Sequence, residues 1–359
     1  MRIPTLERYL ARQIYGAVGF VLAGFLALFA FFDLVGELRD LGTGEYGLRQ
    51  IAAFVLLTVP SHAYELAPVV VLIGTLYVLA HLASNFEYTV MRGAGLSPGR
   101  AGALLARIGL GFVVATFVLG EWIVPSTEQA AQQVRMRALS SVIGRDLRSG
   151  LWFKDEGSFI NVQEARSANV LSGIFIYEFD AALRLRQVSA AERGEYRGDG
   201  LWQLSGVSQT RFTAEGPRTT NVGTAEWRSA VSPDLLNVLI VVPERMSAWK
   251  LYRYMQHLEA NRQKTERYEI AMWKKLFYPL ATLVMMALAL PFAYLHARSG
   301  MVGIKVFLGI MLGIFFHMLN SLFSHLGLLQ NWPPVAAAAL PSAAFFLAGL
   351  TMMWWVERR

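Results

Sequence analysis

The chain has 359 residues, of which 54% are hydrophobic and 16% charged, with a formal net charge of +7 and a mean hydropathy of +0.38. These values fit a chain that is about half membrane and half soluble domain, and they exclude a protein that is soluble throughout. The absence of cysteine is compatible with an exported, oxidising location.

Six apolar stretches of the sequence are each near or above the roughly 20 residues that a helix needs to cross a bilayer. They predict transmembrane helices at about 14–36, 51–82, 101–125, 272–295, 303–327 and 332–356. Because a spanning segment must satisfy its backbone polar groups internally, such runs form helices. The predicted fold class is therefore a six-helix membrane bundle, arranged 3+3, with one polar block inserted between the halves.

The N-terminal part, residues 1–125, begins with a predicted interfacial helix. Leu6, Tyr9 and Ile14 recur at helical spacing and lead into the first span. That span is long and lacks a small-residue cleavage site, so we expect it to stay in place rather than act as a signal peptide. The second stretch contains Pro60, Pro68 and Glu65 and is longer than one straight crossing needs. We expect a kinked or tilted helix, with Glu65 facing protein, water or headgroups rather than lipid.

The link between the second and third spans, 83–97, is the best functional candidate. It starts as a helix with Phe86, Val90 and Met91 on one face and breaks at the glycines that follow. A short helix that projects from a membrane bundle can receive force from a cytoplasmic ATPase, and a lone carboxylate such as Glu87 can dock on a basic groove. The alternative is a loop that merely caps two spans, with Glu87 solvated.

The block 126–268 has the composition of a soluble protein. Short alternating runs separated by Gly, Asp and Asn every eight to twelve residues predict an all-β domain, a sandwich or jelly-roll. An amphipathic helical connector follows at 244–275, with apolar residues recurring at every third position: Met246, Trp249, Tyr252, Met255 and Leu258. The last part, 269–359, carries the remaining three spans.

Positive charge marks one side of the membrane. Basic residues gather at the start of the chain, at the 83–100 link and near the C-terminus, whereas the connection 325–333 has no Lys or Arg. The positive-inside rule then places both termini in the cytoplasm and the β-domain outside.

No pattern for catalysis is present in the sequence. There is no phosphate-binding loop with its lysine, so if ATP powers this protein, another chain hydrolyses it. The six histidines are scattered, and none has metal-ligand spacing with two others. We therefore expect no enzyme activity, no metal site, no cofactor bound by this chain and no nucleic-acid partner.

Two groups of residues suggest a lipid substrate. Arg39, Arg135 and Arg137 follow the first and third spans, where guanidinium groups could meet phosphates or simply anchor in the headgroup region. Aromatic and aliphatic faces of the first and fifth spans could line a cavity for acyl chains, or simply face lipid: Phe25, Phe29, Phe32, Phe315, Phe316, Leu319 and Phe323.

An ordered set of stretches carries a resemblance that covers essentially the whole chain. The set comprises LERYLARQI, FEYTVMRGAG, GEWIVPSTEQAA, GLWFKDEGSFINV, GIFIYEF, the apolar run 272–292 and LPSAAFFL. Together they resemble the LptF/LptG family, the permease subunits of the lipopolysaccharide exporter of Gram-negative bacteria. The GEW and GLW stretches favour the LptG type over the LptF type.

The resemblance implies partners and a location. Family members form an LptF–LptG heterodimer in the inner membrane and bind two copies of the cytoplasmic ATPase LptB, which carries ATP and magnesium. They extract lipopolysaccharide and pass it to a periplasmic bridge of LptC and LptA, beside a periplasmic β-jellyroll.

The resemblance also implies site residues. Glu87 falls on the coupling-helix glutamate of the family, surrounded by Tyr88, Met91, Arg92 and Gly95, and Arg39 and Arg135 fall on basic positions near lipid phosphates. Two positions depart from the enteric pattern. Asp33 replaces a lysine, which shifts the expected phosphate contact to Arg39, and Arg92 replaces an uncharged residue.

Two other readings stay open on the sequence alone. The chain could be the permease of another exporter, for lipoprotein release or efflux, although such permeases usually have four spans per half. It could also be a scaffold that transports nothing and whose β-domain docks periplasmic partners. Co-purification of an ATPase discriminates the scaffold from either permease.

Overall fold

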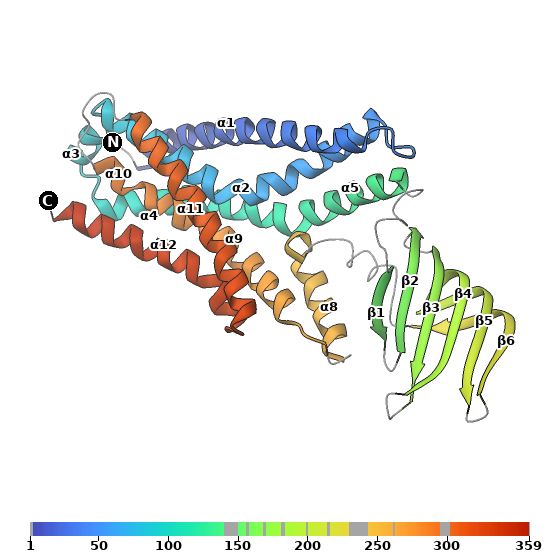
Figure 1. Ribbon diagram of the computed structural model, residues 1–359. Helices are drawn as coiled ribbons and strands as arrows, with labels where there is room; N and C mark the ends of the chain where they lie inside the picture. The colour runs from blue at the N-terminus through green and yellow to red at the C-terminus, as the bar shows by residue number, and fades with distance from the viewer. Residues whose placement is uncertain are drawn as a thin grey trace.

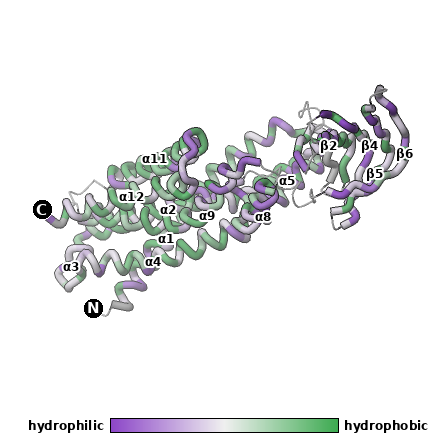
Figure 2. The backbone as a smooth tube through the Cα atoms, turned by 90° about the horizontal axis from the view of Figure 1, so that it is seen from below, coloured by the Kyte–Doolittle hydropathy of each residue, from purple (hydrophilic) through white to green (hydrophobic). Residues whose placement is uncertain are grey.

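A helical bundle and a β-domain make up the structure, a computed structural model (Figure 1). It describes residues 3–139, 150–155, 158–167, 170–180, 184–198, 200–213, 216–229, 243–260, 263–294 and 302–358. Within these residues, six helical spans are long and apolar enough to cross a membrane, as predicted. Figure 2 shows hydrophobic residues along the bundle and a larger share of hydrophilic residues on the β-domain.

The bundle is built around one central helix, α2 (Leu48–Ser84). Most of its residues from Pro68 to Ala83 are buried, whereas Leu56 and Tyr77 are 72% and 46% exposed. Around it and beyond it lie α1 (Ile3–Glu37), α4 (Pro98–Val118), α5 (Val124–Leu139), α9 (Glu266–Ala289), α11 (Val302–Leu329) and α12 (Pro334–Glu357). Shorter elements are η1 (Leu38–Asp40), α3 (Glu87–Gly93), the π-helical turn η2 (Leu119–Ile123), η3 (Pro243–Arg245), α8 (Ala248–Ala260) and α10 (Pro291–Tyr294).

A glycine permits the closest approach of α1 to α2. A Cβ atom added at Gly74 would lie 2.8 Å from the backbone nitrogen of Val18 and 2.6 Å from its Cγ2. Contacts this short require the backbone of α1 to move away. The α1–α2 interface therefore depends on the absence of a side chain at Gly74.

Gly74→Ala is expected to destabilise the chain by about 1–3 kcal/mol, the usual cost of overpacking a well-filled interface. The midpoint of thermal unfolding in detergent measures it. Gly24→Ala is the matched control, because a Cβ there meets nothing within 4 Å. Both variants gain the higher helix propensity of alanine, about 1 kcal/mol over glycine, so the control corrects for it. A Gly74→Ala midpoint as high as that of the control would contradict the expectation.

Several helices are longer than predicted. The interfacial segment is continuous with the first span as α1. The third helix does not end near 125 but passes through η2 into α5 and ends at Leu139, so the predicted start of the β-domain at 126 falls within a helix. Pro60 and Pro68 both lie inside α2 without ending it. The predicted end of the fourth span at 295 lies outside the described residues.

The inserted β-domain is one antiparallel sheet whose strands follow each other in chain order. They are β1 (Leu151–Asp155), β2 (Ser158–Ser167), β3 (Val170–Phe179), β4 (Leu185–Gly198), β5 (Leu201–Thr213) and β6 (Gly216–Arg228). Alternation puts Ile160 and Val162 on the buried face, opposite Ile176 and Ile174 of β3, with Trp202 of β5 fully buried beside them. The predicted all-β insertion is confirmed.

The connector back to the membrane is helical, but its predicted face is partly wrong. Besides Met246, which precedes it, α8 buries Leu251, Tyr254, Met255 and Leu258, in part against α9. Trp249 and Tyr252, which the three-residue spacing assigned to the same face, are 64% and 45% exposed. Steps of three residues drift around a helix of 3.6 residues per turn, so only part of that row can face the bundle. In Figure 1, α8 runs across the β-domain end of the bundle.

Candidate functional site

The segment between α2 and α4 projects from one end of the bundle. The chain leaves α2 through Phe86, whose φ of +61° reverses its direction before α3 begins. Tyr88 and Met91 are buried in the bundle core. Tyr88 contacts the ring of Tyr294 edge-on at 5.3 Å, and Arg92 covers the same ring at 4.9 Å. These contacts pack α3 against the bundle.

The outward side of the same segment carries the Glu87 carboxylate and two solvent-exposed apolar side chains. Glu87 accepts a hydrogen bond of 2.7 Å from the hydroxyl of Tyr9 in α1, which orients its carboxylate. Phe86 and Val90 are 66% and 71% exposed. The predicted common face of Phe86, Val90 and Met91 is therefore wrong, because Met91 points into the core. Sequence reasoning did not select Phe86 and Val90 as site residues, although their apolar character in a short polar link was a signal.

The remaining member of that predicted group, Gly95, ends the segment. Its φ of +99° is a conformation that favours glycine, and the turn delivers the chain to Ser97, which caps α4. Of the five residues predicted for ATPase coupling, Tyr88 and Met91 hold the segment in place. Glu87, Arg92 and Gly95 lie at its surface and remain predicted contacts.

The three predicted phosphate-binding arginines lie at the opposite, β-domain end. Arg39 is exposed in η1. Arg135 of α5 donates to Asp40 (Nη2–Oδ2 2.9 Å) and lies 3.6 Å from Glu37, and Arg137 is exposed two residues further on. Arg39 is the chain neighbour of Asp40, and Asp40 competes with any phosphate for Arg135.

The predicted acyl-chain residues do not form one surface in this chain. Phe32 and Phe315 are exposed, Phe25 and Leu319 pack partly against the core, and Phe29 contacts the His62 ring at 5.0 Å. Phe316 is buried against Phe345 at 5.2 Å. Because α1 and α11 each pack on α2, any single cavity lined by both sets requires a second subunit or a rearrangement.

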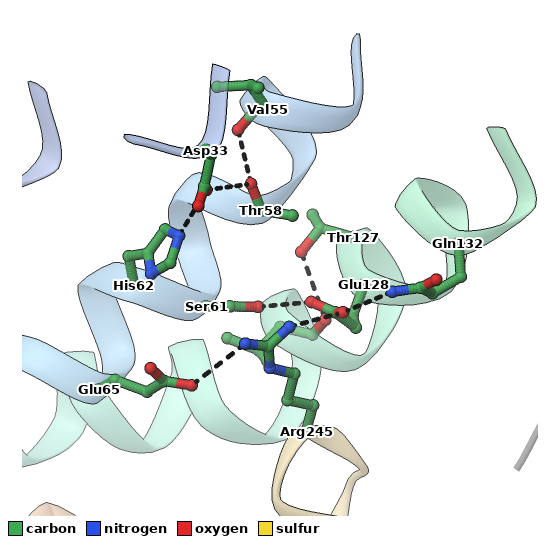
Figure 3. A network of polar contacts seen from close by, with 11 residues as sticks. Asp33, Val55, Thr58, Ser61, His62, Glu65, Thr127, Glu128, Gln132 and Arg245 are labelled. Carbon is green, nitrogen blue, oxygen red and sulfur yellow. Dashed lines mark hydrogen bonds and ion pairs between the residues drawn. The ribbon is translucent and has the colours of Figure 1, made fainter. Parts of the chain in front are cut away.

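A polar network that the sequence did not reveal connects α1, α2, α5 and η3 (Figure 3). Asp33 of α1 is bonded to His62 of α2 (Oδ2–Nε2 2.7 Å) and lies 3.2 Å from the hydroxyl of Thr58. Its carboxylate is therefore engaged within the bundle. His62 thus pairs with Asp33 of α1 rather than with Glu65, which lies three residues further along α2.

The centre of this network is the ion pair between Glu128 and Arg245. Glu128 has a side chain only 2% exposed, and its Oε1 accepts a hydrogen bond of 2.9 Å from Nη1 of Arg245. Ser61 donates to its other oxygen at 2.9 Å. Glu65 lies 3.6 Å from Arg245 on the far side. Burial alone would lower the pKa of the Arg245 guanidinium, but Glu128 and Glu65 outweigh that effect and raise its pKa.

This ion pair joins the two connections of the β-domain. Glu128 lies on α5, which precedes the domain, and Arg245 is in η3, which follows it. A second bond acts beside it, because Glu121 in the π-helical turn accepts the N–H groups of Ala248 and Trp249 at 2.9 and 3.4 Å. The carboxylate thereby caps the N-terminus of α8. The base of the β-domain is held to the bundle at both points.

The network lies at one level of the spans. Glu65 and Lys275 begin stretches of about 20 residues, 65–84 and 275–294, that reach the other end of the bundle, and Asp33 lies near the end of α1 on the same side as they do. A helix of that length crosses about 30 Å, the thickness of the hydrocarbon core. The polar residues therefore mark one boundary of the apolar layer, and α5 and the start of α2 extend beyond it.

Within the part of the chain that the structure describes, no group of three His, Asp or Glu side chains could hold a metal ion. The assembled features are a projecting segment at one end, a buried ionic network at the other and apolar spans between them. Such an arrangement can bind a partner and transmit movement.

Comparison with known proteins agrees with this arrangement. Residues 8–355 match the family described as lipopolysaccharide export system permease LptF/LptG. The chain is 32% identical to the lipopolysaccharide export system permease protein LptG of Haemophilus influenzae over 99% of both chains. It is 31% identical to that of Escherichia coli K12 over 97% of this chain and 98% of the other. The chain belongs to the LptF/LptG family of lipopolysaccharide export system permeases.

Proposed function

We propose that this chain is the membrane permease subunit of an ATP-driven exporter that extracts lipopolysaccharide from the inner membrane. The observation that carries the proposal is the match over residues 8–355, together with full-length likeness to two permeases of that name. The architecture supports it, since six spans, a fixed projecting segment and an inserted β-domain are the parts that such a machine needs.

The proposed assembly places the chain beside an LptF-type permease, on two copies of the ATPase LptB. The bridge proteins LptC and LptA meet its β-domain. Both termini and α3 face the cytoplasm in this proposal, and the β-domain faces the periplasm. ATP and magnesium belong to the ATPase, and this chain binds no cofactor.

Extraction of the lipid follows from elementary energetics. Each buried CH₂ of an acyl chain contributes about 0.8 kcal/mol to membrane affinity, so a lipid with several chains does not leave the bilayer unaided. A cavity between two permeases could shelter those chains against exposed side chains such as Phe32 and Phe315. Arg39 would meet a phosphate at the rim, and closure driven through α3 would expel the lipid toward the β-domain.

The first experiment purifies the tagged chain from its native membrane in mild detergent and identifies bound proteins and lipids by mass spectrometry. We expect a second six-span permease, an ATPase and lipopolysaccharide. Recovery of another lipid or a lipoprotein with the ATPase would favour a different exporter. Recovery without any ATPase would favour a scaffold and contradict the proposal.

Glu87→Ala is expected to weaken association with the ATPase several-fold while leaving membrane insertion intact, because the carboxylate is surface-placed and fixed by Tyr9. Quantitative co-purification measures the effect. Glu7→Ala is the control, since Glu7 is an acidic residue on the same end of the bundle, paired with Arg107. Equal ATPase recovery for both variants would remove Glu87 from the coupling mechanism.

A further inference from the structure

We infer that α8 is a membrane-surface helix whose exposed face, formed by Trp249, Tyr252 and Arg253, lies in the lipid headgroup layer on the β-domain side. The partner is the bilayer surface itself rather than the exported lipid, so the inference goes beyond the proposed function. Its consequence is that the second connection of the β-domain is held by both protein and membrane.

The two faces of α8 differ in what covers them. The inner face is buried in a small core with α9, through Leu251, Tyr254 and Leu258. The outer face exposes 64% of Trp249 and 45% of Tyr252, whose rings contact each other at 6.2 Å. Arg253 is exposed beside them, followed one turn later by polar residues. Large aromatic groups with a polar edge, next to an arginine, are the side chains that favour the membrane interface.

The position of α8 matches the level of that interface. Its first residues bond to Glu121 of the π-helical turn, and Lys275 donates to the carbonyl of Met246 just before it. Lys275 stands at the boundary of the apolar layer, about 20 residues from the other end of its span. Because α8 runs across the bundle end there (Figure 1), its length lies along the membrane surface rather than through it.

Neighbouring residues extend the same surface into the apolar layer. Trp122, on the π-helical turn, is 64% exposed. An apolar cavity of about 240 Å³ lies under the start of α8, lined among others by Phe117, Trp273 and Leu276. A lipid with its headgroup beside Arg253 could place an acyl chain in this cavity. Aromatic residues at the boundary with an apolar cavity below them fit a lipid better than water.

The absence of cysteine from the sequence allows a direct test. Trp249→Cys and Tyr252→Cys would each carry a nitroxide label in the purified assembly, reconstituted in vesicles of phosphatidylethanolamine and phosphatidylglycerol. Collision with oxygen and with a water-soluble nickel complex reports the depth of each label. Val114→Cys, exposed near the end of α4 and seven residues before Glu121, and Thr220→Cys, exposed on β6, supply lipid and water references.

At both α8 sites we expect an oxygen-to-nickel collision ratio several-fold above that of Thr220→Cys and below that of Val114→Cys. A ratio equal to that of Thr220→Cys would place α8 in water and overturn the inference. Labels that neither reagent reaches would mean that a protein partner covers α8, which would also overturn it. The result does not depend on which lipid is exported, so failure of the proposed function would leave it standing.

Discussion

Arg245→Met is expected to lower the free energy of unfolding by about 3–5 kcal/mol, the usual effect of removing one partner from a buried ion pair. The change leaves the Glu128 carboxylate buried, with Ser61 and Gln132 as its remaining partners and no cation in contact. Uncompensated buried charge, rather than loss of attraction, is the physical cause. The measurement is chemical or thermal unfolding of the purified chain in detergent, followed by circular dichroism.

Arg184→Met is the matched control for this prediction. Arg184 also forms an ion pair at 2.9 Å, with Asp180, but its side chain is 80% exposed. Exposed pairs contribute about 0–1 kcal/mol, so this variant should unfold nearly as the parent does. The double variant Arg245→Met/Glu128→Leu should recover much of the loss, because no charge is then stranded. Similar losses for the two arginine variants would refute the importance of burial here.

Val90→Asp is expected to reduce ATPase association by tenfold or more, an effect on the order of 1.4 kcal/mol or above. Val90 and Phe86 are the two most exposed apolar side chains of the projecting segment, one helical turn apart. In the proposed assembly, they would fill an apolar recess of the ATPase beside the Glu87 contact. A carboxylate placed in that recess would have no partner, and burial of an unpaired charge is costly. Co-purification and ATPase titration in detergent measure the loss.

The control adds the same charge elsewhere on that end of the bundle. Gly99→Asp lies in the first turn of α4, where an added Cβ atom meets nothing within 4 Å. It should bind the ATPase normally. If Val90→Asp assembles as well as Gly99→Asp, then the exposed apolar pair does not form the contact, and α3 meets the ATPase through charge alone.

The spans and the class of the insertion could be predicted because both depend on local patterns. A run of about 20 apolar residues must be helical in lipid, and alternating runs between turn residues favour strands. The length of the third helix was not predictable in that way. Residues 124–139 contain Pro125 and many polar side chains, so they resemble a soluble segment. They stay helical because they extend the helix beyond the apolar layer, packed on α2.

The functional sites, like the fold, were predictable only where a local sequence pattern marks them. The projecting segment was found because it is a short polar link between two spans, but its exposed and buried faces depend on the reversal at Phe86. The ionic network could not be found from spacing, because Glu128 and Arg245 are 117 residues apart and the β-domain lies between them in the chain. One local signal existed, the two carboxylates Glu121 and Glu128 at the end of an apolar span, each of which has to be paired or solvated.

The π-helical turn at Leu119–Ile123 also determines where this chain tolerates a change of length. Such a turn accommodates one extra residue within an α-helix, so the helices on either side keep their relative orientation. Deleting one residue there would leave a regular helix with Glu128 still directed at Arg245. The same deletion within α5 before Glu128 would rotate that carboxylate by about 100° and separate the pair. Homologous chains that differ by a single residue in this helix should therefore carry the gap at this turn.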